Sequence, residues 1–401
     1  MDPIFTAVSS NANHLYTLLR CIGFAPKASV QITPEGIRFS VEESRVMQGL
    51  AFLDKALFTT YSFTPPSGRS NHSDGEPDNN DDGSDSGIYP HFLISLSALL
   101  ETLQIFGISD NNASANNSFA STSAHQQNST ASNAFTTPAL LLNRSCTLRY
   151  SHVGGPLSII ISEAGVTTTC ELTTYEPDDP SFGSAAGELD IPLQRDAIIM
   201  KIIMRSAWLH NAVTELDATN PSVLTISASA KREPFFALSG SGGPFSESTV
   251  EFSVEKDGER GSSLSHAHHK VLTEDGSTSR PQPKKAKLAP TVTETFLVNP
   301  PSSMGHRVKQ NYRFSLIRKA TRAMAVASKV SIRGDRQGVL SLQFMIELGG
   351  NDNSGGTSGG VLPSGGFGGN VSFVDFRFVP LVDEDEGEAE EYDDGEEEEE
   401  L

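Results

Sequence analysis

The sequence has little of what disulfide-stabilised, membrane and secreted proteins need. Its 401 residues include only three cysteines, Cys21, Cys146 and Cys170, without Cys-x-x-Cys spacing. An odd number of dispersed cysteines predicts structural thiols in a reducing compartment. No apolar run reaches the length of about 18 residues that indicates a membrane helix. The N-terminus also lacks the basic, apolar and small-residue succession of a signal peptide.

Basic residues are scarce, with 30 Lys and Arg against 50 Asp and Glu and a formal net charge of -20. Residues 383–400 contain 14 acidic residues and residues 71–90 contain six, and neither segment has Lys or Arg. With both segments set aside the chain is formally neutral, so its folded body can still meet nucleic acid. The acidic runs lack the Gly turn and fixed ligand spacing of a calcium loop. We therefore expect solvated charge, no metal and no other cofactor.

Residues 323–346 predict two antiparallel strands with a tight connection. Met324, Val326, Val330 and Ile332 alternate with more polar or smaller residues, and apolar residues return after the Gly-containing stretch 334–338. Apolar residues at every second position are typical of a strand with one buried face, and Gly and Asp are typical hairpin-turn residues. Similar hairpins are predicted over 30–41 and 157–172. The motif is therefore a repeat.

Amphipathic helices are predicted near 11–22, 95–106, 206–217 and 307–319, from apolar residues spaced three and four apart. Ser95 and Ser206 are candidate N-caps. Each helix is accompanied by predicted strands, so the chain repeats a helix-plus-strands unit four times. Polar, apolar-poor stretches interrupt the pattern, and we interpret them as disordered insertions.

The predicted fold class is α+β, with two similar domains of two repeats each. Domain one is predicted over 1–173, with insertions at 65–90 and 110–137. Residues 174–190 are interpreted as an interdomain connector, because they have Pro, Gly and acid but no periodicity. Domain two is predicted over 191–380, with insertions at 256–291 and 349–370, and residues 381–401 form an acidic tail.

The repeats resemble the sliding-clamp (PCNA-like) architecture, in which antiparallel sheets lie outside and helices line the inner wall. Local sequence is similar to the Rad-one/Rec-one family of DNA-damage checkpoint clamp subunits, in its fungal type with low-complexity insertions. The matching segments are Leu15–Phe24, Leu93–Gly107, Gly154–Thr174 with Tyr175-Glu176-Pro177 beyond it, Leu209–Asp217, Lys329–Phe344 and Phe373–Pro380.

The resemblance implies a non-catalytic subunit of a heterotrimeric ring in the nucleus. Its two related partners would be of the Rad-nine and Hus-one types. A dedicated clamp loader would place the ring on double-stranded DNA at damage, without sequence specificity. There the ring would recruit checkpoint signalling and repair proteins.

A sliding clamp needs dispersed cations on its helical wall, because phosphate contacts are independent of sequence. The alternative for each cation is simple solvation. The family tends to carry a basic residue at the positions of Arg20, His210 and Arg318. His210 is a departure, since a neutral imidazole offers no fixed charge, and the second helix presents Glu101. The DNA-facing candidates are Arg20, His210, Arg313, Arg318, Lys319 and Arg322, and Arg318 and Lys319 are favoured because basic residues cluster around them.

Two further sets of residues are candidates for recognition by other proteins. Lys284, Lys285 and Lys287 form a basic run flanked by prolines, which predicts a nuclear import signal. Its alternative is a chance basic run. Phe182, Leu189 and Ile191 are apolar residues near the connector and are candidates for client docking, with simple linker packing as the alternative.

Two other functions stay open from the sequence. A metal-dependent 3′–5′ exonuclease would need paired carboxylates at strand ends, and the available candidates, Asp54, Glu101 and Asp375, lie on dissimilar elements. A replicative clamp would form a homotrimer in solution. We expect a monomer or a heterotrimer instead.

Overall fold

The structure is a computed structural model that describes residues 2–65, 89–105, 145–163, 165–177, 190–244, 247–254, 291–292, 295–348 and 370–382. Most of the four predicted insertions and the tail beyond residue 382 lie outside these ranges. The import candidates Lys284, Lys285 and Lys287 and the docking candidates Phe182 and Leu189 also lie outside them.

The first half of the chain contains two helices, each preceded by a strand that leads into it. The Asn11 side chain caps α1 by accepting the Asn13 N–H at 3.0 Å, and the Ser95 hydroxyl accepts the Ala98 N–H at 3.3 Å. The elements are β1 (Phe5–Ser9), α1 (Ala12–Cys21), β2 (Lys27–Thr33), β3 (Gly36–Glu43), β4 (Met47–Asp54), η1 (Lys55–Leu57), β5 (Thr60–Phe63), β6 (His91–Ser95), α2 (Leu96–Ile105), β7 (Ser145–Tyr150), β8 (Leu157–Glu163) and β9 (Val166–Leu172).

The second half repeats this order with a more broken last helix. Its elements are η3 (Arg195–Ala197), β10 (Ile198–Arg205), α4 (Ser206–Asp217), β11 (Val223–Ala228), β12 (Phe236–Ser241), β13 (Ser248–Val254), β14 (Thr291–Val292), β15 (Thr295–Val298), η4 (Ser302–Met304), β16 (Val308–Arg313), α5 (Phe314–Ile317), η5 (Arg318–Ala320), α6 (Thr321–Val326), β17 (Lys329–Asp335), β18 (Leu340–Leu348) and β19 (Asn370–Phe378). The hairpins β2–β3, β8–β9 and β17–β18 confirm the three predicted from the sequence.

The strand order makes the repeat explicit. In the described residues one sheet runs β5-β1-β7-β8-β9 and another runs β14-β13-β12-β11-β16. A nine-stranded sheet joins the orders β15-β10-β17-β18-β19 and β4-β3-β2-β6. The strands β5, β1, β7, β8 and β9 of the first half thus match β15, β10, β17, β18 and β19 of the second. In the same way β4, β3, β2 and β6 match β13, β12, β11 and β16.

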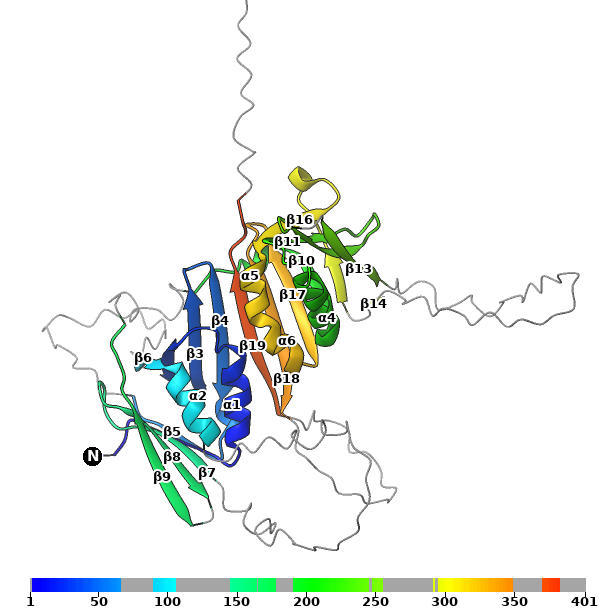
Figure 1. The fold of residues 1–401 in the computed structure, drawn as a ribbon. Coiled ribbons are helices and arrows are strands. Elements are labelled where there is room, and N and C mark those ends of the chain that lie inside the picture. Colours follow the sequence, from blue (N-terminus) through cyan, green and yellow to red (C-terminus); the bar gives the residue numbers. More distant parts are fainter. Residues whose placement is uncertain are drawn as a thin grey trace, which may run out of the picture.

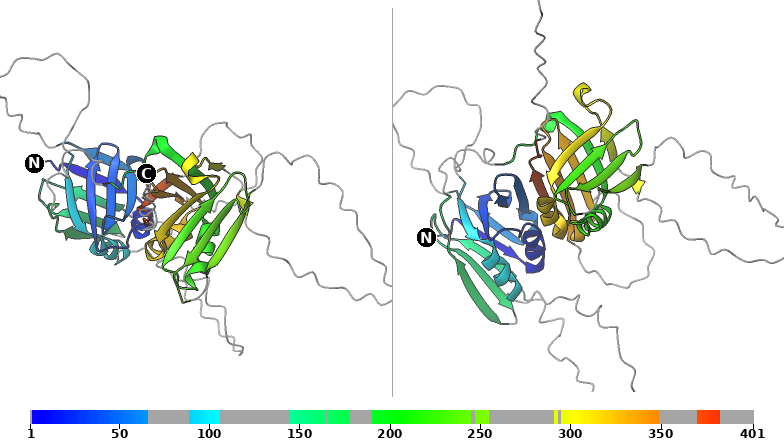
Figure 2. Two further views of the ribbon diagram at one scale, coloured as in Figure 1. Left: turned by 90° about the horizontal axis from the view of Figure 1, so that it is seen from above. Right: turned by 45° about the horizontal axis from the view of Figure 1, so that its top comes forward.

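The α-helices of the described residues cover the same face of the nine-stranded sheet (Figure 1). Contacts between neighbours place them in the order α2, α1, α6, α4, so they form a continuous wall across both halves. We call this the helix wall, and the opposite side of the sheet the outer face. The views in Figure 2 show the two remaining sheets flanking the nine-stranded one. No helix in the described ranges is long and apolar enough to cross a membrane.

The two halves meet where β19 pairs with β4, a junction we call the seam. Phe376 faces Gly49 in this pairing, and a Cβ at Gly49 would lie 2.7 Å from the Phe24 ring. Glycine is therefore needed there for Phe24 to cross the seam and lie beside Phe376, with the two rings tilted and their centroids 6.2 Å apart. Phe376 is fully buried and also contacts the rings of Phe344 and Phe378.

Three local predictions were wrong. Residues 308–313 form strand β16 and not a helix, because Val308, Gln310 and Tyr312 alternate inward. Met324 lies on α6, so the hairpin begins only at β17. Ser206 does not cap α4, since it is already the first helical residue and its hydroxyl donates to the Met324 carbonyl at 2.8 Å.

The three thiols should differ sharply in reactivity. Cys21 and Cys146 are buried, and burial raises the pKa of both thiols to about 12. Only the thiolate reacts, so at pH 8 very little of either buried thiol is in its reactive form. We expect a maleimide to label half-buried Cys170 first, as mass spectrometry of peptides will show. Equal labelling of all three thiols in the folded chain would contradict the burial, and denatured protein provides the control.

Candidate DNA-facing surface and connector anchor

The helix wall carries two of the predicted cations near its centre. Arg20 is exposed on the last turn of α1, and its guanidinium lies 5.7 Å from the centroid of the Tyr16 ring. Arg322 is exposed on α6 and donates to the Gly23 carbonyl at 3.0 Å. Gly23 follows α1, so Arg322 links the two halves. Both guanidinium groups are thus held near the seam.

Two other predicted cations are partly neutralised. Arg318 pairs with Asp217, at the end of α4, at 3.3 Å, and Lys319 pairs with half-buried Glu43 across the seam. The Lys319 ammonium also lies 5.9 Å from the Phe24 ring centroid. These two residues were favoured from the sequence because of local charge density. The pairing lowers the charge that they offer to phosphate and gives Lys319 a part in holding the seam.

Arg313 and His210 complete the set. Arg313 ends β16, is exposed and precedes α5, while His210 is half-buried on α4. Within the described residues neither Arg20 nor Arg313 has an ion-pair partner, so their full charge is available. Exposed Glu101 and Glu215 on α2 and α4 offset part of the charge of the wall. The wall is therefore only weakly cationic.

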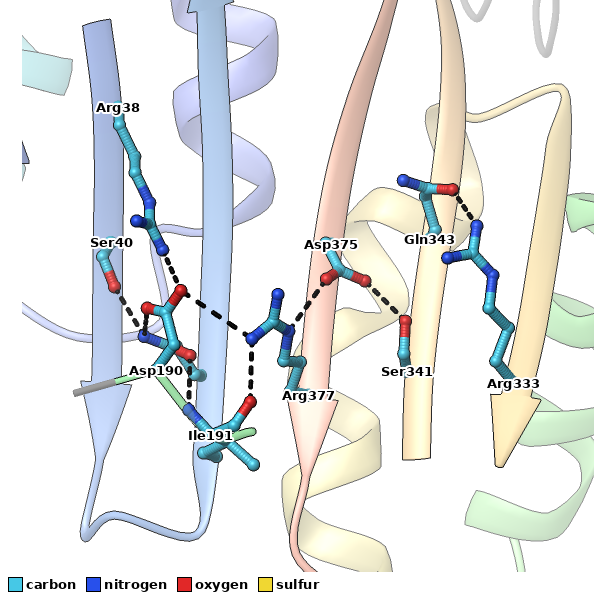
Figure 3. Close-up of polar contacts among 10 residues, drawn as sticks. Arg38, Ser40, Asp190, Ile191, Arg333, Ser341, Gln343, Asp375 and Arg377 are labelled. Carbon is cyan, nitrogen blue, oxygen red and sulfur yellow. Dashed lines mark hydrogen bonds and ion pairs between the residues drawn. The ribbon is translucent and has the colours of Figure 1, made fainter. Parts of the chain in front are cut away.

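On the outer face, a polar cluster fastens the end of the connector across the seam (Figure 3). The Asp190 carboxylate pairs with Arg38 of β3 and, at 3.7 Å, with Arg377 of β19. Gln48 of β4 donates to Asp190 at 2.8 Å and accepts the Ile191 N–H at 3.1 Å. Because these partners belong to both halves, the connector end holds the seam from outside, as Lys319 and Glu43 do from the helix wall.

Asp375 extends this cluster along the sheet. Ser341 donates to it at 2.8 Å and Arg377 at 3.2 Å (Figure 3). Burial raises the pKa of the Asp375 carboxyl, against the opposing effects of the Ser341 hydrogen bond and the charges of Arg377 and Arg333. Asp375 is thus engaged by structural partners.

A second buried cluster, centred on Asp335, was missed from the sequence. Asp335 is fully buried, and its carboxylate accepts the Gln194 N–H at 3.0 Å and the Val339 N–H at 2.8 Å. Its carbonyl accepts from Gln310 at 3.2 Å. Burial, with Asp335 nearby, raises the pKa of the Tyr312 hydroxyl. Asp335, the last residue of β17, was a sequence signal for the turn that follows but not for its contact with Gln194, which lies 141 residues away in the chain.

The remaining candidates lie apart. Ile191 is 7% exposed, and its carbonyl accepts from Arg377 at 2.8 Å, which favours linker packing over docking for this residue. Asp54 accepts the Ala56 N–H at 2.8 Å and Glu101 is exposed on α2, so neither adjoins Asp375. Among the described residues, no group of three or more His, Cys, Asp or Glu is placed to hold a metal ion.

Comparison with known proteins gives consistent matches. The family described as "Repair protein Rad1/Rec1/Rad17" matches residues 4–346. "DNA damage checkpoint control protein rad1" of Schizosaccharomyces pombe is 29% identical over 388 residues, covering 96% of this chain and 89% of that protein. "Cell cycle checkpoint protein RAD1" of Homo sapiens is 27% identical over 347 residues, covering 86% and 87%.

One relative has a different kind of name. "DNA repair exonuclease REC1" of Mycosarcoma maydis is 27% identical over 206 residues, covering 50% of this chain and 39% of that protein. Among solved structures, PCNA from Thermococcus kodakaraensis matches 94% of this chain and all of its own, with a TM-score of 0.51 and 14% identity. That likeness confirms the predicted PCNA-like α+β fold.

Proposed function

The chain belongs to the Rad1/Rec1/Rad17 family of repair proteins, and from this premise we propose that it is one subunit of a DNA-damage checkpoint clamp. The ring would encircle duplex DNA in the nucleus and recruit signalling and repair proteins. Its partners would be two related clamp chains, of the Rad-nine and Hus-one types, placed on DNA by a clamp loader. The names of the yeast and human relatives support the checkpoint role.

The seam is the observation that carries this proposal. Within the chain, β19 of the second half pairs with β4 of the first. Their counterparts in the repeat are β9 and β13, which pair on one side with β8 and β12. On the other side, in the described part of the chain, β9 has no partner strand and β13 has only the short pairing with β14. A neighbouring clamp chain can supply the same pairing. Such head-to-tail contacts between unlike edges generate rings when the rotation closes.

Blocking the β9 edge should abolish ring assembly. The N–H groups of an edge strand point alternately toward its neighbour and toward its free side. One of the two adjacent substitutions T168P and T169P therefore removes an N–H from the free side of β9. For that variant we expect a folded chain that no longer co-purifies with the two partner chains. S62P, on the opposite edge strand β5 of the same sheet, is the matched control. A one-to-one-to-one ring that forms equally well with all three variants would contradict the proposal.

Charge reversal on the helix wall tests contact with DNA. We expect R20E with R313E to shorten retention of the ring on duplex DNA, and to reduce the salt slope of binding by about one for each phosphate that is no longer neutralised. Retention on circular DNA over a range of salt measures this. Exposed Arg149 of β7, remote from the helix wall, provides the control variant R149E. Unchanged retention in the double variant would remove these arginines from the DNA-facing set.

We propose that this subunit acts without catalysis, although one relative is named as an exonuclease. Asp54, Glu101 and Asp375 lie on separate elements, and Asp375 is occupied by Ser341 and Arg377. Two-metal nucleases need carboxylates that converge on ions about 4 Å apart. Degradation of single-stranded DNA by the purified chain, abolished by D375N, would contradict this. Monodisperse homotrimers in solution would instead favour a replicative clamp.

Import through Lys284, Lys285 and Lys287 and client docking near the connector remain part of the proposal. Deleting residues 280–290 tests the first by the location of the chain in cells that lack the partner subunits. Because Ile191 is buried, Phe182 and Leu189 are the candidates that we retain for client docking.

A further inference from the structure

A second site on the outer face, which we call the cationic pocket, lies at the start of β10, away from the seam. Its volume is about 460 Å³. It is lined by apolar and cationic residues together with Asn299, and by no carboxylate among the described residues. The residues that matter are Leu193, Ile199 and Leu297 among the apolar ones and Arg195, Lys201 and Arg333 among the cationic ones.

The strand register brings the lining residues together. Lys201 of β10 lies opposite Leu297 of β15 on one side and Arg333 of β17 on the other. Neighbouring strands are about 4.8 Å apart, so the three side chains form one short row. The ladder between β10 and β17 shifts register between Ile198 and Met200. Such a bulge bends the strand and re-aims its side chains, and here it lies next to the row.

The charge of this pocket is only partly offset, by the Asp375 carboxyl, on which the charge of Arg333 acts. Arg333 donates to Ser331 at 3.1 Å and to Gln343 (Figure 3), both neutral. Within the described part of the chain, Arg195, Lys201 and Arg333 have no ion-pair partner. Arg377, two strands from Arg333 on the same face, is paired with Asp190 and Asp375 instead. The sheet therefore holds Arg333 in place through neutral hydrogen-bond partners, and most of the positive charge of the pocket stays available to an external anion.

The lining also specifies the kind of anion. Leu297 is 56% exposed, a large apolar surface beside two cations. It lies on β15, the last strand of the nine-stranded sheet in the described residues, where an extended peptide can add its backbone. Duplex DNA presents phosphates without an apolar group for this surface. We infer that the cationic pocket binds an extended acidic segment of a partner protein, with one apolar side chain against Leu193 and Leu297.

Fluorescence anisotropy with the full-length chain tests this site without the ring. The probe is a labelled peptide of about ten residues, in which Asp and Glu surround one leucine. We expect binding that weakens as salt rises and falls about tenfold or more in K201E with R333E. Exposed Lys309 on β16 lies outside the pocket, so K309E should leave the affinity unchanged. The matched Asn and Gln peptide should not bind.

Several outcomes would overturn the inference. Absence of binding to the full chain would do so, as would equal binding by K201E with R333E and by K309E. Binding that appears only after residues 383–401 are removed would assign the pocket to the acidic tail of the chain itself. Displacement of the probe by duplex DNA, but not by unlabelled acidic peptide, would assign it to nucleic acid. Because ring assembly is not measured, failure here leaves the clamp proposal standing.

Discussion

Replacing Phe376 by alanine should lower the free energy of unfolding by about 3–5 kcal/mol, the range for a large buried aromatic. Phe376 is fully buried and contacts the rings of Phe24, Phe344 and Phe378 from both halves of the chain. Its removal leaves a cavity at the seam, which Gly49 opposite cannot fill. Urea unfolding followed by fluorescence and by circular dichroism will measure the loss of stability.

Phe373 is a matched control on the same strand. It is 49% exposed, so F373A should cost less than about 1 kcal/mol. If F376A and F373A were equally destabilising, Phe376 would not be the main apolar contact across the seam. If the two halves unfolded in separate steps in F376A but in one step in the unchanged chain, the contacts at the seam would be what couples the unfolding of the two halves.

Replacing Asp335 by alanine should destabilise the fold by about 2–4 kcal/mol, because the change removes a buried carboxylate that accepts from two N–H groups, one of them buried. Those groups belong to Gln194, just beyond the connector, and to Val339, at the start of the last hairpin strand. The same unfolding measurement applies. We also expect faster amide exchange at these two positions, since the hydrogen bond that protects each amide is removed.

Asp196 provides the control for charge and position. It is exposed in η3, close in sequence to Gln194, and D196A should change the free energy of unfolding by less than about 0.5 kcal/mol. An equal decrease for D335A and D196A would show that the buried hydrogen bonds of Asp335 contribute little. Protection of Val339 that survives D335A would have the same meaning.

The sequence by itself determined most of the local structure. Alternation and turn residues predicted the hairpins now seen as β2–β3, β8–β9 and β17–β18, and the three–four spacing predicted a helix close to the observed α4, Ser206–Asp217. These patterns succeed because each residue's face is fixed by its own strand or helix. Residues 308–313 carried the same alternation, Val308, Gln310 and Tyr312, but they were included in the helix predicted near 307–319.

Only the tertiary structure decided which charges remain available. Lys319 was a candidate for DNA contact because of the basic residues around it, yet its partner Glu43 lies 276 residues away. Arg318 and Asp217 are 101 residues apart, and Asp190 reaches Arg38 and Arg377 across the seam. The charge that a side chain offers to solvent depends on its neighbours in space. Sequence spacing cannot supply those neighbours, because they belong to elements far apart in the chain that meet only in the folded protein.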